Sequence, residues 1–212
     1  MDDRLIARFH RIVEAVRSSD EPLSCWSTLL EITGQASNQA VAGLDVRADI
    51  VSLTEQTDRV LRANRLPPEV TFFWFGLCDL LVNGHEIKGY YLSGYSGTDP
   101  DGDSNSLVYS PESRWLRSNV LESIKDALKR IERTARDAGK ELPEDYQALD
   151  YALMFGAAAL LTKFVMVPLN TRSLPVYVGF DSGDWALVNT PAPGQNEEWP
   201  IVPAVTVDES SS

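Results

Sequence analysis

The chain has 212 residues, 43% of them hydrophobic and 24% charged, which is enough apolar material for an ordinary globular core. Its formal net charge of −12 argues against nucleic acid as a partner, because contacts to phosphate need Lys and Arg. No apolar run approaches the roughly 20 residues that span a bilayer, and the N-terminal stretch has no apolar signal core. We therefore expect a cytoplasmic protein that does not bind membranes.

Residues 1–66 are expected to be helical. Apolar residues recur at helical spacing over 3–17, over a second segment that begins near Pro22 and stops at Gly34, and over 44–64. The small polar residues of 34–43 favour a loop, and two consecutive prolines at 67 and 68 end the third helix.

The stretch 70–95 reads as a β-hairpin and as the centre of the sheet. Aromatic and β-branched residues are dense on both sides of Asn83-Gly84, and Asn-Gly is the pair that a type I′ hairpin turn favours. A turn-rich loop follows at 96–106, and a short strand is expected at 107–109.

Two further helices are expected before the chain returns to the sheet. The first starts near Asn119, which with Glu122 has capping-box spacing, and runs to about residue 138. The second opens at Pro143 and contains the most apolar run of the chain. Residues 175–180 and 185–188 then read as two strands joined by a turn.

These elements predict an α+β fold in which N-terminal helices precede an antiparallel sheet. The sheet would be built from two hairpins with two helices between them. We expect one domain over 1–190, helical over 1–66 and containing the sheet and two helices over 67–190. The Pro-rich, acidic and serine-containing residues 191–212 are expected to form a loosely ordered tail.

The sequence is poor in residues for catalysis. It has two histidines, His10 and His85, and two cysteines, Cys25 and Cys78, and no pair among them has metal-ligand spacing. Ser96 stands in a partial nucleophile-elbow pattern, but no histidine follows it in the chain to act as its base. We assign no catalytic residue, and a binding protein is favoured over an enzyme.

The loop after the hairpin leaves one alternative open. Asp99, Asp101 and Asp103 alternate along it, and carboxylates at alternate positions can wrap Ca²⁺ or Mg²⁺. An EF-hand is excluded because its sixth and twelfth positions would be Ser104 and Ser110. A looser cation site, in a metal-binding protein or a metal-dependent enzyme, remains the alternative to a cofactor-free binding protein.

Most of the acid excess falls outside the helical segments. Residues 70–111 contain five acidic residues and one basic residue, and 151–212 contain six and two. A basic protein partner would be attracted to such a surface. We expect its contacts at the acidic loops and at an aromatic and charged pair that precedes the fourth helix: Asp99, Asp101, Asp103, Asp181, Asp184, Arg114 and Trp115.

Three segments resemble a group of uncharacterised bacterial cytosolic proteins: Trp74 to Leu77, Tyr109 to Trp115 and Val178 to Asp184. The second is similar to a pattern of an aromatic residue, Pro-Glu-Gly-Arg and another aromatic residue, with Ser113 in place of the glycine. Proteins of this group are small and acidic and are suspected of neutralising toxins of neighbouring bacteria. The resemblance therefore implies an immunity protein. The group has no established active site, so the resemblance assigns no catalytic residue.

Overall fold

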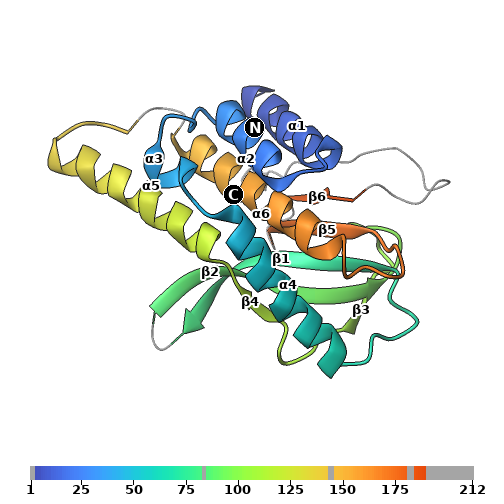
Figure 1. The fold of residues 1–212 in the computed structure, drawn as a ribbon. Helices are drawn as coiled ribbons and strands as arrows, with labels where there is room; N and C mark the ends of the chain where they lie inside the picture. Colours follow the sequence, from blue (N-terminus) through green and yellow to red (C-terminus); the bar gives the residue numbers. More distant parts are fainter. Residues whose placement is uncertain (1–2, 83–84, 143–145, 181–183, 190–212) are drawn as a thin grey trace, which may run out of the picture.

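The computed structural model describes residues 3–82, 85–142, 146–180 and 184–189 (Figure 1). Its helices are α1 (Asp3–Ser18), α2 (Pro22–Ile32), α3 (Gln39–Ala42), α4 (Val46–Ala63), α5 (Asn119–Asp137) and α6 (Tyr146–Met166). Its strands are β1 (Phe72–Val82), β2 (His85–Ser96), β3 (Ser106–Tyr109), β4 (Trp115–Arg117), β5 (Val176–Phe180) and β6 (Trp185–Leu187). The expected α+β class is confirmed, with the N-terminal helices preceding the strands.

The six strands form one sheet in the order β3-β2-β1-β5-β6, and β4 pairs with β2 beside β3. The central hairpin is confirmed, because β1 and β2 are antiparallel from Phe72↔Tyr95 to Val82↔His85. The expected turn residues 83 and 84 lie outside the described residues. The second hairpin is also antiparallel, with Val178 opposite Ala186.

The expectation of a wholly antiparallel sheet is wrong at one junction. Strands β1 and β5 run parallel, with Phe73 opposite Val176 and Leu77 opposite Phe180. A parallel pair needs a long crossover connection, and here the crossover contains the two helices α5 and α6. The sheet is therefore mixed.

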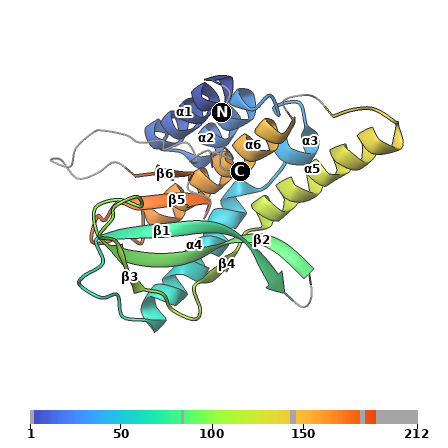
Figure 2. The ribbon, with the colours of Figure 1, turned by 180° about the vertical axis from the view of Figure 1, so that it is seen from behind.

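The helices of the described residues lie on one side of this sheet. The helices α4 and α6 lie in front of the strands in Figure 1 and behind them in Figure 2, and α1 and α2 lie beyond α6. Helix α6 is apolar on all sides, which is typical of a helix buried on all sides. Its contacts with α1, α2, α4, α5 and β5 place it in the middle of the molecule. None of the helices in the described ranges is long and apolar enough to cross a membrane.

Local capping and loop details differ from the sequence-based expectations. The helix cap is Ser118 rather than Asn119: its Oγ accepts a hydrogen bond from the backbone N–H of Leu121 at 3.1 Å. Glu122 instead accepts from the backbone N–H of Lys88 at 2.6 Å, which joins α5 to the hairpin. The expected loop over 34–43 contains the short helix α3.

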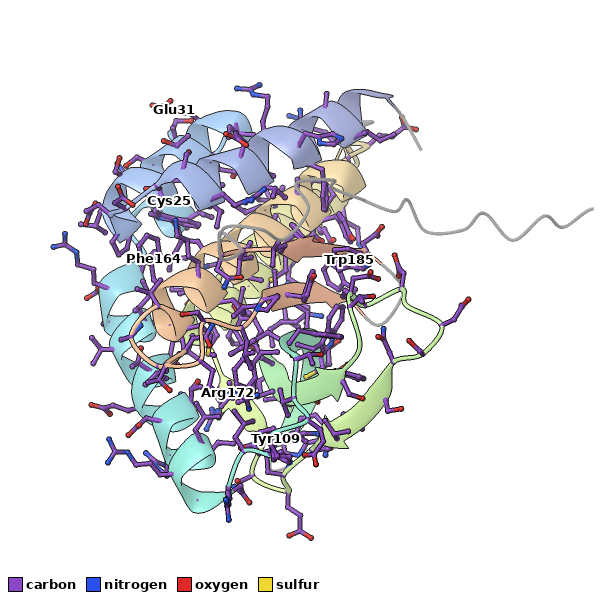
Figure 3. All side chains as sticks on the ribbon, turned by 90° about the vertical axis from the view of Figure 1, so that its right-hand side faces the viewer. Cys25, Glu31, Tyr109, Phe164, Arg172 and Trp185 are labelled. Atoms are coloured by element: carbon purple, nitrogen blue, oxygen red, sulfur yellow. The ribbon has the colours of Figure 1, made fainter. Side chains whose placement is uncertain are left out.

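The two faces of the sheet differ in what covers them. Strand side chains alternate, so neighbours along β1 point to opposite faces. Phe73 and Phe75 join the large core formed with the helices, which also contains Ile12 and Phe155. A second apolar cluster lies on the other face, formed by Phe72, Trp74, Tyr177 and Trp185 with Tyr91, Tyr95 and Leu187 at its edge. We call this side of the sheet, which none of the described helices covers, the open face. Figure 3 shows Trp185 on the side of the molecule away from α4.

Candidate binding site

The open face carries aromatic rings from four strands in mutual contact. Phe72 of β1 stacks on Tyr95 of β2, with ring centroids 5.3 Å apart and planes 8° from parallel. It also meets the edge of Tyr177 at 5.3 Å, and Tyr177 in turn meets Trp185 of β6 at 5.2 Å. Trp74 donates its indole N–H to the hydroxyl of Tyr91 at 3.0 Å. These contacts hold the rings in fixed positions, as buried aromatic clusters do.

Two glycines give these rings room to lie flat on the sheet. A Cβ at Gly76 would be 2.1 Å from Cζ of Tyr91, and a Cβ at Gly179 would be 2.8 Å from Cη2 of Trp74. The residues lie opposite each other in the parallel pair of β1 and β5. A glycine in a strand interior often marks such a close approach. The two glycines therefore shape the open face together with the aromatic residues, because a position without a side chain leaves space for a ring.

The loop over 97–105 closes one end of this face. Thr71 anchors its first residue, donating its hydroxyl to the carbonyl of Gly97 at 2.7 Å and accepting from the Gly97 N–H at 2.9 Å. Within the loop, Asp99 accepts from the backbone N–H of Asp101 at 3.0 Å, and the Asn105 amide donates to the carbonyl of Asp99. Gly97 has φ +141°, a backbone conformation that only glycine adopts without strain.

A pocket of about 210 Å³ lies between this loop and the sheet. Its apolar lining consists of six aromatic side chains from four strands: Phe72, Trp74, Tyr91, Tyr95, Phe180 and Trp185. The loop supplies the remaining lining residues Pro100, Asp101 and Asn105. Ligand pockets that enclose drug-sized molecules are about 300–1,000 Å³, so this one suits a smaller group.

The loop and the strands are joined by a polar contact at the pocket. The Asp101 carboxylate accepts a hydrogen bond from the indole N–H of Trp185 at 3.1 Å, which fixes the loop to β6. Asn105 Oδ1 is buried and has no hydrogen-bond partner, although buried carbonyl oxygens are normally paired. Burial, with a smaller contribution from the nearby Asp99 carboxylate, raises the pKa of Tyr177 to about 12.

The structure separates the three loop carboxylates that suggested a cation site. Asp99 binds the backbone of its own loop, Asp101 binds Trp185, and Asp103 is exposed. Within the described ranges, no three His, Cys, Asp or Glu side chains lie close enough together to hold a metal ion. The geometry of this loop gives a Ca²⁺ or Mg²⁺ site no support.

The second acidic turn is only partly described. Asp181 lies outside the described residues. Asp184 is 9% exposed and accepts a short hydrogen bond of 2.5 Å from the hydroxyl of Tyr151. Burial first, then this hydrogen bond and the charge of Asp184, raise the pKa of Tyr151 well above its ordinary value. Asp184 therefore fixes α6 to the start of β6 and offers little surface to a partner.

Trp115 belongs to the sheet, and Arg114 directly precedes it. Trp115 opens β4, opposite Tyr91 of β2, and is 48% exposed. Its ring meets that of Tyr91 at 6.0 Å, and the Arg114 guanidinium lies 4.6 Å from its centroid. Arg114 is also held by a 2.7 Å hydrogen bond to Ser110 Oγ. The pair therefore extends the open face at the edge opposite β6. It precedes α5 as expected, and its Trp115 also opens the strand β4, which the sequence did not predict.

Sequence reasoning placed Asp101 and Trp115 among the contact residues but missed the surface that joins them. The missed residues include Trp74, Tyr91, Trp185 and Asn105. A signal for Trp74 was present. Residues 72–75 are all aromatic, so alternate side chains place aromatic rings on both faces of the sheet. The meeting of Trp185 with Asp101 needed the tertiary structure, since these residues are 84 positions apart.

No protein-family model matches the chain, and no match was found among curated proteins or solved structures.

Proposed function

We propose that this chain is a non-enzymatic binding protein whose open face, with the acidic loop at its end, holds a basic protein partner. One observation carries the proposal: exposed Trp115 and half-buried Tyr91 and Tyr95 edge a buried aromatic cluster on the sheet face that no described helix covers, and the carboxylates of 97–105 border it. Trp, Tyr and Arg are the residues most enriched at the energetic centres of protein interfaces.

Charge supports the choice of a basic partner. The segment 70–111, which builds most of this face and its loop, has five acidic residues and one basic residue. Complementary charge accelerates encounter and rejects partners of the wrong sign. The resemblance to immunity proteins fits this picture, and we propose a toxin with a basic active site as the partner, neutralised in the cytoplasm.

The test compares how strongly the wild type, two site variants and a control variant capture the partner. The variants lose a charge or an aromatic side chain at different places on the molecule. The immobilised full chain is exposed to a host lysate, and retained proteins are eluted by a salt gradient and identified. The site variants are Asp101→Asn with Asp103→Asn, and separately Trp115→Ala. A matched control removes two exposed carboxylates from the helical side, Glu55→Gln with Asp126→Asn.

We expect the wild type to retain one basic protein, the two site variants to release it at lower salt, and the control to behave as the wild type. Retention by all variants at equal salt would place the interface elsewhere. Loss of retention in the control as well would mean that net charge, and not this face, holds the partner.

A further inference from the structure

The pocket between the sheet and the loop 97–105 has the chemistry of a receptor for a cation. Its walls are aromatic, and the loop contributes the Asp101 carboxylate to its lining. We propose that the pocket receives a single basic side chain, Arg or Lys, of the protein partner. This inference rests on the proposed function, and it makes this side chain the central contact of the proposed interface.

Aromatic faces attract cations because the ring carries negative charge density above its plane. A cation over Trp, Tyr or Phe gains about 0.5–1 kcal/mol when exposed and about 2 or more when desolvated. Trp74, Tyr91 and Trp185 line the pocket together, so a cation there would contact several rings.

Asp101 has unused capacity for a positive charge. Its contact within the chain is the neutral indole N–H of Trp185, and the ion pairs among the described residues all involve other carboxylates. A carboxylate has about four lone-pair sites, so it can accept from Trp185 and from a cationic donor together. The indole N–H holds the carboxylate at the pocket before the ligand arrives, which lowers the cost of ordering it on binding.

The size of the pocket limits the ligand to one side chain. A volume of about 210 Å³ is below the range for drug-sized ligands, and the pocket is open toward solvent on the sheet surface. An arginine or lysine head group on a partner backbone could enter from that side. The exposed Trp115 on β4 lies on the same face and would contact the surrounding partner surface.

The experiment uses the full chain with ¹⁵N-labelled tryptophan and three small probes. N-acetylarginine amide and N-acetyllysine amide carry the cation, and N-acetylcitrulline amide has nearly the shape of the arginine probe without its charge. The indole N–H signal of Trp185 reports directly on the Asp101 contact and is assigned by Trp185→Phe. We expect saturable shifts with at least one cationic probe at millimolar concentration and weaker binding of citrulline by about tenfold.

Variants then test whether Asp101 binds the cationic probe. Asp101→Asn should weaken binding of the cationic probe by about tenfold or more, because it removes one charge-assisted hydrogen bond. Glu55→Gln, which neutralises an exposed carboxylate of α4 that does not line the pocket, should bind as the wild type. The comparison of charged with neutral probe on the wild type does not depend on whether a variant folds.

Equal binding of citrulline and arginine probes, or no saturable shift with any probe, would overturn the inference. Its failure is distinguishable from failure of the proposed function. Partner capture that depends on Asp101 and Trp115 without any probe binding would overturn the pocket inference alone. Selective probe binding combined with partner capture that ignores both residues would overturn the proposed interface and leave the cation preference of the pocket standing.

Discussion

Asp49 and Ser118, which lie 69 positions apart, form a buried hydrogen bond of 2.6 Å that joins α4 to the first turn of α5. The Asp49 carboxylate is 2% exposed and also accepts from the backbone N–H groups of Asn119 at 2.9 Å and Val120 at 3.3 Å. The first N–H groups of a helix have no partner within the helix. A carboxylate there pairs with them and interacts favourably with the positive end of the helix dipole.

Replacing Asp49 by Asn should lower the free energy of unfolding by about 2–3 kcal/mol, since hydrogen bonds to charged groups contribute about 1.5–3 kcal/mol each. Urea denaturation measures this change. Asp58→Asn on the same helix is the control, because its ion pair with Arg62 is at the surface and should contribute less than about 1 kcal/mol. Equal losses in the two variants would contradict the capping role.

Lys163 of α6 should be needed to hold the end of α1. Its ammonium donates to three carbonyls where α1 ends: Val16 at 2.8 Å, Arg17 at 2.9 Å and Ser19 at 2.5 Å. Lys163→Met keeps the apolar stem but leaves these carbonyls without their donor, so we expect a loss of about 2 kcal/mol or more. Hydrogen exchange should show α1 opening first. Lys129→Met, at an exposed position of α5, should change stability little, and a similar loss there would refute the prediction.

Gly179→Ala should destabilise the sheet and disturb the open face. Its Cβ would be 2.4 Å from the carbonyl oxygen of Asp184, a backbone atom that cannot move away by rotation. Overpacking of this kind costs about 1–3 kcal/mol. Gly156→Ala is the matched control: its nearest neighbour is 3.3 Å away, and alanine gains helix propensity there. Melting temperatures decide between the outcomes, and a tolerated Gly179→Ala would contradict the described contact.

Stability should fall at alkaline pH as buried tyrosines are forced to ionise. Burial first, and nearby carboxylates second, raise the pKa of Tyr146 and of Tyr177 to about 12, whereas an unfolded tyrosine titrates near 10. The unfolded state therefore releases these protons first, so the stabilisation is complete below about pH 10 and is lost as pH rises toward 12. Phenolate absorbance measured at rising pH should show tyrosines that ionise later than an unfolded tyrosine does. The variant Tyr177→Phe should show one such tyrosine fewer. A single transition near pH 10 in the folded protein would contradict this.

Millimolar Ca²⁺ or Mg²⁺ should leave the melting temperature unchanged, because the described carboxylates of 97–105 do not converge. A ligand that binds only the folded state would raise it. A rise with cation that disappears in Asp99→Asn would restore the metal-site alternative.

The chain's local patterns were sufficient to locate nearly all of its longer elements. Apolar spacing over 44–64 predicted α4, and the Asn-Gly pair between two aromatic segments predicted the hairpin of β1 and β2. Such signals are local, because a helical turn and a tight hairpin involve residues close in sequence. The cap of α5 was misplaced by one residue, since Ser118 and Asn119 are both suitable caps and only the side-chain geometry distinguishes them.

What the sequence by itself determined is therefore the set of elements, their apolar faces and the acidic character of the loops. The tertiary structure decided which strands pair and which distant side chains meet. The parallel contact of β1 with β5 depends on how α5 and α6 cross the sheet, and the contact of Asp101 with Trp185 depends on that pairing. Both contacts join residues far apart in the sequence, and each residue could have met many other partners. The packing of the whole core selects the partner that it meets.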